Sequence, residues 1–484
     1  MIARRSLLAA CAVALAPLCV PAPVTAAVPT RMVAFPSAHA EIVVATTSMR
    51  DLVAGRAVRF VYIAERGALV GVRVTVRQGT RSWVATRTAI PAAAGGHPSG
   101  VALPPAAVRA VATCRPTTVT VAAFTTRRTP VAVDRVTLLR DAARCPDRPP
   151  RLTVPARPSA TTKGIAVPAT FLQESPARMA ADLNAVRSLG AGFLRVPMDW
   201  PKVEARPGVR RWTALDAAVR GTTARRIGTL GLLTAAPRWA SPEGTSYPRD
   251  PVRFAAFAAR TVARYAPYGV RHWEVWNEPN FALFWAPAVD PASYARLLRL
   301  TSITIHAVQP RAVVISGGLA RVDFDSTSLP ANVFLEQMLV SGVVPQTDAI
   351  GLHPYTFPVS PLDPDDSTRN AWRLIERPLD GILALLRLAD QESKPLWITE
   401  YGAPDRGSGA ATGSPDGVGE ARQAQLVTDL YAALRGRAWA GPAFWYALRD
   451  RTDIAASSVE SAFGLLHADG RLKPAGTAYR ALAP

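Results

Sequence analysis

The chain has 484 residues, of which 49% are hydrophobic, and a formal net charge of +20 at pH 7. This length predicts two domains, although α/β barrels run long as single units, and the hydrophobic fraction is typical of a globular protein. Arginine supplies nearly all of the positive charge, because the chain contains only four lysines: Lys163, Lys202, Lys394 and Lys473. Such a bias is typical of a GC-rich genome, so the charge does not indicate a nucleic-acid partner.

The N-terminus has the pattern of a secretory signal. Arg4 and Arg5 precede a short apolar run at 6–20, and small residues stand before Ala27. A basic start, an apolar stretch and a small-residue cleavage site together predict a signal peptide over 1–27, and hence a secreted protein.

Other export routes stay open. The paired arginines partly resemble the signal of the route that exports folded proteins. A sequence resembling a lipoprotein cleavage box ends at Cys11, but it would leave a very short apolar region. Pro17 and Pro21 interrupt the run, and no later stretch reaches the roughly 20 apolar residues of a membrane-spanning helix.

Four cysteines bear on the redox compartment. If Cys11 and Cys19 leave with the signal, the mature chain keeps only Cys114 and Cys145. In an oxidising compartment these two favour one disulfide at the end of the first domain, and two buried free thiols are the alternative. No cysteine or histidine cluster has the spacing of metal ligands, so neither a metal nor a cofactor is expected.

Residues 38–148 alternate apolar with polar side chains, with turns between several of the runs. Alternation of this kind is typical of strands that bury one face. The first domain, 28–148, is therefore predicted to be a small all-β sandwich of about seven strands. The clearest runs are 57–65, 69–79, 80–90 and 117–126.

This first domain is strongly basic. It holds 17 arginines against 6 acidic residues, a net charge of +11. One hypothesis is that it contacts an anionic cell-wall polymer, through an attraction that salt would screen. The alternative, which we favour, is an arginine-rich β surface that packs on the neighbouring domain.

A proline-rich connection separates the first domain from the second. Prolines concentrate between residues 146 and 162, and we place a stiff linker at 149–162. From 163 to 484, apolar strand-like runs alternate with helical stretches. The strand-like runs are 163–169, 192–198, 228–235, 272–278, 312–318, 348–355, 395–401 and 441–448.

Eight strand-helix units in this length predict an α/β fold, a (β/α)8 TIM barrel over residues 163–484. A doubly wound open sheet is the rival. It calls for a glycine-rich phosphate turn after its first strand, and 163–173 has none. The helical stretches include 177–190, 250–266, 290–308, 331–342, 370–390 and 419–436.

Two glutamates stand at the ends of these runs. Glu278 ends the fourth run and Glu400 lies at the end of the seventh, and strands four and seven face each other across a barrel mouth. Two carboxyls about 5–5.5 Å apart suit double displacement at a sugar carbon, because one attacks while the other protonates the leaving oxygen. Repulsion between them would keep the pKa of the proton donor high.

The segments around these glutamates resemble a known group of enzymes. "WEVWNEPN" at 273–280 and "WITEYGAP" at 397–404 are similar to the catalytic strand ends of clan A glycoside hydrolases, the retaining (β/α)8 glycosidases that include families 5 and 39. The segment 193–219 resembles their second-strand region, "GLHPYTF" their sixth strand and "AFWYAL" their eighth. The resemblance spans residues 160–484 and does not include the β domain.

The resemblance implies roles for the two glutamates and for residues beside them. Glu278 would be the acid/base and Glu400 the nucleophile. Asn277 would donate to the sugar 2-hydroxyl, a contact that strengthens in the transition state. Arg195 and Tyr355 would hold Glu400 ionised and oriented.

The same resemblance gives the barrel mouth its remaining lining. His353 would lie there as a donor, and Trp445 would offer a flat apolar face to the sugar. Loop aromatics after the third, fourth and sixth strands could also stack on sugars or pack within the loops: Trp239, Phe281, Trp285 and Phe357.

Two tryptophans precede Glu278. Trp276 would exclude water from that carboxyl, which raises the pKa of an acid that must arrive protonated. Because side chains alternate along a strand, Trp276 and Glu278 should point one way and Asn277 the other, unless the strand end bends. Trp273 is then expected in the outer core.

Other acids in these segments are assigned to structure or left without a role. Glu204 and Asp216 are expected to make hydrogen bonds around the second loop. The long glycine-rich loop after Glu400 is a candidate lid, and Asp405 and Asp416 lie on it.

Together these features predict a secreted, monomeric retaining glycoside hydrolase that acts within an oligosaccharide or polysaccharide. An exo-acting β-glycosidase and a transglycosylase of the same fold stay open. The rival from another class is a non-catalytic glycan-binding protein. The identity of the sugar does not follow from these residues.

Overall fold

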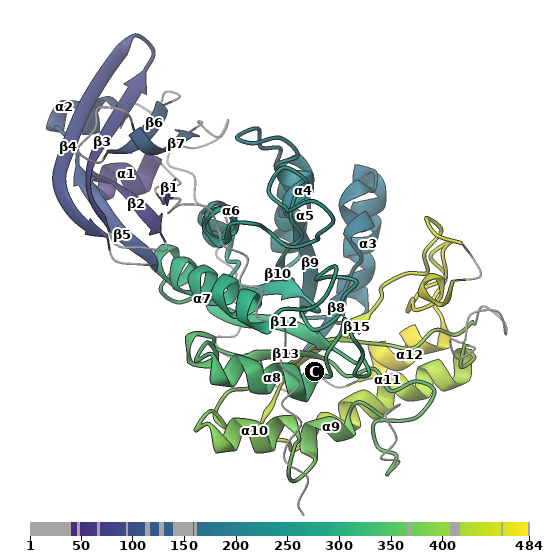
Figure 1. Ribbon diagram of the computed structural model, residues 1–484. Coiled ribbons are helices and arrows are strands. Elements are labelled where there is room, and N and C mark those ends of the chain that lie inside the picture. Colours follow the sequence, from purple (N-terminus) through teal and green to yellow (C-terminus); the bar gives the residue numbers. More distant parts are fainter. Residues whose placement is uncertain are drawn as a thin grey trace, which may run out of the picture. The chain divides into compact units, whose positions relative to one another are not determined.

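The structure, a computed structural model, describes residues 40–45, 49–64, 68–92, 95–111, 117–124, 130–138, 158, 162–364, 370–406, 417–455 and 458–482 (Figure 1). Several predictions concern residues outside these ranges. They are the signal peptide at 1–27, the pairing of Cys114 with Cys145, most of the linker at 149–162, and Asp416.

Seven antiparallel strands form the all-β region, as the alternating pattern predicted. Alternate residues meet in one core: Val58 and Phe60 of one sheet belong to the same buried cluster as Val74 and Val76 of the other. One sheet has the order β1 (Ala40–Val44), β2 (Ala57–Ala64), β5 (Gly95–Ala102). The second has the order β4 (Arg81–Ala92), β3 (Ala68–Gln78), β6 (Thr117–Phe124), β7 (Pro130–Leu138). Two short helices, α1 (Met49–Gly55) and α2 (Pro105–Val111), complete the described part of this region.

Eight parallel strands form a closed barrel, so the (β/α)8 prediction is confirmed and the open doubly wound sheet is excluded. Closure is visible in the pairing, because β8 bonds to β9 on one side and to β15 on the other. The strands are β8 (Lys163–Ala166), β9 (Phe193–Asp199), β10 (Gly228–Thr234), β11 (His272–Asn277), β12 (Val313–Ala320), β13 (Ile350–His353), β14 (Leu396–Tyr401) and β15 (Ala440–Tyr446).

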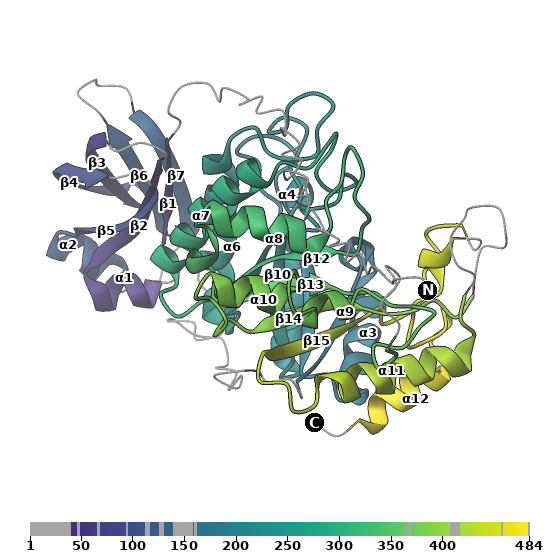
Figure 2. The ribbon, with the colours of Figure 1, turned by 60° about the horizontal axis from the view of Figure 1, so that its bottom comes forward.

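Helices surround the barrel strands (Figure 2). Asp250 and Asp290 cap two of them by accepting backbone N–H bonds ahead of an N-terminal proline. The expected helix at 370–390 is instead two short helices, because Pro378 cannot continue a helix. The helices are α3 (Pro176–Ser188), α4 (Trp200–Val203), α5 (Thr213–Ala224), α6 (Pro251–Tyr265), α7 (Pro291–Val308), α8 (Ala331–Val340), α9 (Arg373–Glu376), α10 (Ile382–Leu388), α11 (Glu420–Leu434) and α12 (Pro474–Ala481), with 3-10 turns η1 (Ala169–Gln173), η2 (Ala266–Tyr268), η3 (Val344–Gln346) and η4 (Val459–Ser461).

The all-β region contacts α6 and α7 of the barrel. Val43, Val61 and Ile63 form one buried cluster with Ala255, Ala259 and neighbouring residues of these helices. Charged groups border this cluster. Arg260 of α6 donates to Glu41 at 3.0 Å and to Asp134 at 3.4 Å, and Arg210 lies 3.7 Å from the same Asp134.

No helix within the described ranges is both long and apolar enough to cross a membrane.

Candidate active site

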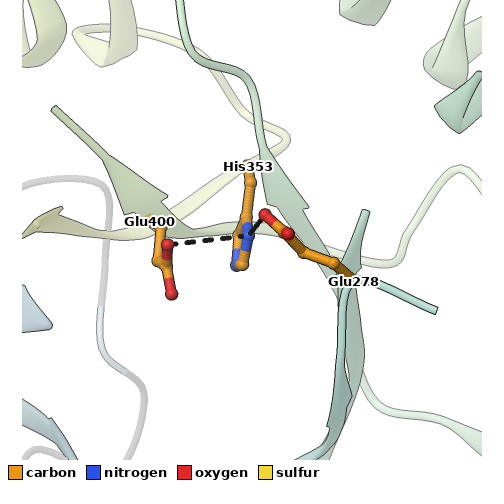
Figure 3. Close-up of side chains that lie close together, drawn as sticks. All are labelled: Glu278, His353 and Glu400. Atoms are coloured by element: carbon orange, nitrogen blue, oxygen red, sulfur yellow. Dashed lines mark hydrogen bonds and ion pairs between the residues drawn. The ribbon is translucent and has the colours of Figure 1, made fainter. Parts of the chain in front are cut away.

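Glu278 and Glu400 meet at the barrel mouth with His353 between them (Figure 3). Glu278 follows the end of β11, His353 ends β13 and Glu400 lies near the end of β14. One oxygen of each glutamate and a ring nitrogen of His353 all lie within 4.8 Å of one another. The closure of the barrel therefore brings together residues that are far apart in the sequence.

The end of β11 bends, and this bend decides which side chains reach the mouth. Trp276 and Glu278 have positive φ angles of 76° and 44°, so simple alternation fails there. Asn277 and Glu278 both join the site. Trp276 instead packs on Phe254 and Trp285. The expected role of Trp276 as a wall beside Glu278 is therefore corrected.

The outward packing of the tryptophans is stabilised by hydrogen bonds. The indole of Trp276 donates to the Phe284 carbonyl at 3.1 Å. Trp273 is fully buried and donates to Gln309 at 2.9 Å, in agreement with its expected place in the outer core.

Three groups hold Glu400 as an anion. Arg195 Nη1 donates to its Oε1, Tyr355 donates to its Oε2 at 2.9 Å, and His353 Nδ1 lies 3.8 Å away. Burial alone would raise the pKa of Glu400. His353, Arg195 and Tyr355 more than offset this effect, so the pKa of Glu400 falls below its ordinary value.

Arg195 is itself buried and connects several acceptors. Its Nη2 donates to Asn277 Oδ1 at 2.8 Å, and its Nε donates to Glu274 Oε2 at 2.5 Å. Glu274 was missed from the sequence. The signal that could have found it is a charged residue in the middle of an otherwise apolar strand run at 272–277, where every position is buried.

Glu278 differs from Glu400 in its surroundings. Burial raises the pKa of Glu278, and the nearby Glu400 carboxylate adds to this, while His353 and Arg195 oppose it. His353 Nδ1 lies 2.7 Å from Glu278 Oε1. Burial lowers the pKa of His353, but Glu400 and Glu278 raise it above the ordinary value. The pKa values of the two carboxyls thus depart from the ordinary value in opposite directions.

A third acid lies beside the pair. Tyr446 donates to Glu460 at 3.2 Å, and the ring of Tyr446 contacts Phe463, which also meets Tyr355. Burial, and then the Glu400 carboxylate, raise the pKa of Glu460. Glu460 was also missed, because it lies in the short 3-10 turn η4 after β15, where no sequence pattern marks it.

Three aromatic residues expected to stack on sugars occupy different environments. Trp445 is fully buried and donates to the Phe463 carbonyl at 3.1 Å. Trp285 is also buried and stacks on Tyr247, with ring centroids 5.0 Å apart. Neither offers an open face in this structure, which differs from the expectation. Trp239 is half-buried, and its indole donates to the Glu204 carbonyl at 2.9 Å.

Acids assigned to structure make structural contacts. Glu204 accepts from the Gly208 amide at 2.8 Å and from the Trp200 indole at 2.9 Å. Asp216 pairs with Arg264. Asp405, which had no assigned role, is buried and lies 2.7 Å from Lys473 Nζ.

Among the described residues, one group has donor atoms close enough together to hold a metal ion. It consists of Glu278, His353 and Glu400. Both oxygens of Glu400 already accept hydrogen bonds from Arg195 and Tyr355. The arrangement suits nucleophilic attack by one carboxyl and proton transfer by the other.

The fold was compared with known proteins. No protein-family model and no curated protein matches the chain in sequence. A family 39 glycoside hydrolase from Bacteroides cellulosilyticus WH2 superposes with a TM-score of 0.51 at 18% identity, covering 86% of this chain and 77% of that one. A GH5_18 protein from Streptomyces cattleya, in complex with Manβ1-4GlcNAc, gives 0.50 at 19%, covering 66% and 79%. The (β/α)8 barrel fold that the sequence resemblance implied is confirmed.

Proposed function

We propose that this protein is a retaining glycoside hydrolase that cleaves β-linked glycans by double displacement. The observation that carries the proposal is the pair of facing carboxyls, Glu278 and Glu400, with oxygens within 4.8 Å and pKa values displaced in opposite directions. Retaining enzymes place their carboxyls about 5–5.5 Å apart, whereas inverting enzymes leave about 6.5–9.5 Å for a water molecule.

The pKa of each carboxyl is shifted in the direction that its step requires. Glu400, held as an anion by Arg195 and Tyr355, attacks the anomeric carbon and forms a glycosyl-enzyme ester. Glu278, whose pKa is raised by burial, donates its proton to the departing glycosidic oxygen. Glu278 then removes a proton from the water that cleaves the ester, and both groups return to their starting states.

Asn277 is oriented for contact with the sugar. Its side-chain oxygen accepts from Arg195 at 2.8 Å, which assigns that end of the amide to the guanidinium. The amide NH2 is then available to a hydroxyl of the substrate. A bond to the 2-hydroxyl would strengthen as positive charge develops at the anomeric carbon.

The proposal extends to location and substrate type. We infer from the N-terminal signal pattern that the protein is secreted. We also propose that it acts within a polysaccharide as a monomer. Contact of its basic β region with an anionic cell-wall polymer is the hypothesis that competes with the favoured one, in which this region only packs on the barrel. Digestion of polysaccharides followed by product sizing separates internal cleavage from terminal cleavage. Retention on purified cell walls at about 0.15 M salt tests the wall contact.

The decisive experiment is mass spectrometry of the intact protein after exposure to 2-deoxy-2-fluoro glycosides with good leaving groups. A fluorosugar ester mapped to Glu400 supports the proposal, and Glu400→Gln should remove it. Glu460→Gln is the matched control, because this third acid lies nearby and its loss should leave the ester on Glu400 in place. An ester on Glu460 in the unmodified protein contradicts the assignment.

A non-catalytic glycan-binding protein predicts another outcome. It would bind oligosaccharides, form no ester with any donor and release no product from any glycan. Binding to Glu400→Gln together with turnover by the unmodified protein would exclude it.

A further inference from the structure

A line of buried hydrogen bonds joins Glu274 to Glu278. Thr399 Oγ1 donates to Glu274 Oε1 at 2.8 Å and lies 3.1 Å from His353 Nε2. On the other side of the ring, His353 Nδ1 lies 2.7 Å from Glu278 Oε1, the contact drawn in Figure 3. Glu274, Thr399 and His353 have no exposed surface.

The direction of each bond follows from the donors available. Glu274 is paired with the guanidinium of Arg195, and as a carboxylate it can only accept. Thr399 has one hydroxyl proton, which it donates to Glu274. The Thr399 oxygen can then only accept from His353, so His353 carries a proton on Nε2.

This assignment determines what Glu278 faces. In a neutral imidazole that is protonated on Nε2, the other nitrogen, Nδ1, is an acceptor. A protonated Glu278 carboxyl can donate to that nitrogen. An ionised Glu278 would meet a lone pair there and lose the bond, so this tautomer favours the protonated acid.

We propose that Glu274 and Thr399 are positioning residues that fix the Nε2-protonated tautomer of His353 and thereby keep the transferable proton on Glu278. The inference rests on the proposed function, in which Glu278 protonates the leaving group. Glu274 also accepts from Arg195, which donates to Glu400. Glu274 thus orients a neighbour of each proposed reacting group, Arg195 beside Glu400 and, through Thr399, His353 beside Glu278.

The other charged groups around the ring decide whether it is neutral or doubly protonated. Glu400 lies 3.8 Å from His353 Nδ1, and Arg195 acts on Glu278, His353 and Glu400 together. If Glu400 draws a second proton onto the ring, the imidazolium still donates from Nε2 to Thr399, but it also donates from Nδ1 to an ionised Glu278. The tautomer therefore keeps the proton on Glu278 only while the ring is neutral. The bond to Thr399 is therefore the same in both charge states of His353.

The variant Thr399→Val tests the inference, because it removes the acceptor at Nε2 and preserves the shape of the side chain. The His353 proton can then move to Nδ1 and donate to an ionised Glu278, so the pKa of Glu278 should fall. The alkaline limb of the kcat/KM profile should move to lower pH. Turnover of glycosides with poor leaving groups should fall about tenfold near neutral pH, because these need the proton. Turnover of dinitrophenyl glycosides should not change.

Two further variants separate this effect from general damage. Thr399→Ser keeps the hydroxyl and should restore the profile. Thr356→Val is the matched control, because it also removes a buried hydroxyl that bonds a tyrosine, Tyr401, beside Glu400. It should leave the dependence on the leaving group unchanged. An equal loss for good and poor leaving groups in Thr399→Val overturns the inference.

A measurement without substrate addresses the tautomer itself. The chain has 6 histidines, so the ring nitrogens can be resolved by 15N NMR and assigned to His353 with the variant His353→Gln. We expect a protonated Nε2 in the unmodified protein and a protonated Nδ1 in the neutral ring of Thr399→Val. If the unmodified protein turns over no glycoside, the proposed function fails while this spectrum still tests the tautomer. A neutral ring protonated on Nδ1 in the unmodified protein refutes the inference.

Discussion

The variant Tyr355→Phe removes one hydroxyl, and with it one stabilising contact of Glu400, the proposed nucleophile. Tyr355 donates to Glu400 Oε2 at 2.9 Å, and its ring is also held by packing on Tyr401, Phe357 and Phe463. The ring should therefore stay in place when the hydroxyl is lost. A hydrogen bond to a charged group contributes about 1.5–3 kcal/mol, which corresponds to roughly 10- to 150-fold in kcat/KM.

The pH dependence of kcat/KM shows in which direction the lost hydrogen bond acts. Tyr355 helps to hold the pKa of Glu400 down, so the variant should raise it. A raised pKa of the nucleophile moves the acid limb of kcat/KM to higher pH, so the loss should be largest on the acid side and shrink toward neutral pH. The alkaline limb, which belongs to Glu278, should stay where it is.

The assay is the pH profile of kcat/KM for a fluorogenic aryl glycoside. Tyr401→Phe is the control, because Tyr401 lies beside Tyr355 with ring centroids 6.4 Å apart, and its hydroxyl bonds Thr356 instead of Glu400. That variant should leave the acid limb unchanged. A shift of the alkaline limb in Tyr355→Phe, or a loss independent of pH, would refute the reasoning.

Three other substitutions have expected outcomes. Arg195→Lys should lower kcat/KM more than about 100-fold and reduce the free energy of unfolding by about 3 kcal/mol, because a point charge cannot satisfy three buried acceptors; kinetics and urea unfolding check this. Burial raises the pKa of Glu278 in the folded protein. Ionisation of this carboxyl therefore destabilises the fold at pH values above the pKa of an unfolded glutamate and has no effect at lower pH. Glu278→Gln should therefore melt higher than the unmodified protein at about pH 8 and show no such gain at about pH 4 in calorimetry. Asp134→Ala should cost about 3 kcal/mol in urea unfolding, because Arg210 and Arg260 both lose a buried partner, and a loss within about 0.5 kcal/mol would contradict this account.

The sequence was sufficient for the barrel and for the meeting of the two glutamates at its mouth. Strand-helix alternation gave all eight strands, and the position of Glu278 and Glu400 at strand ends placed them at the mouth. The bend at Trp276 could not be predicted, because a positive φ at a tryptophan reflects tertiary packing on Phe254 and Trp285 that local propensity does not encode.

Glu274 and Thr399 escaped prediction for a different reason. Both lie inside apolar strands, where a polar side chain is interpretable only when its partners are known. Those partners come from other strands, since Glu274 meets Arg195 of β9 and Thr399 of β14. Only the closure of the barrel shows that these residues form one connected group.

The contact between the β region and α6 has a consequence for engineering. Arg260 is only 11% exposed and takes two carboxylate partners from strands that precede the barrel in the chain. A truncation that begins at residue 163 would leave this guanidinium, and the apolar faces of Ala255 and Ala259, without the groups that cover them. The barrel is therefore a poor unit for recombination by itself. Fusion of this barrel to modules from other proteins should succeed when the cut is made ahead of β1. The seven strands of the β region then stay attached to the barrel.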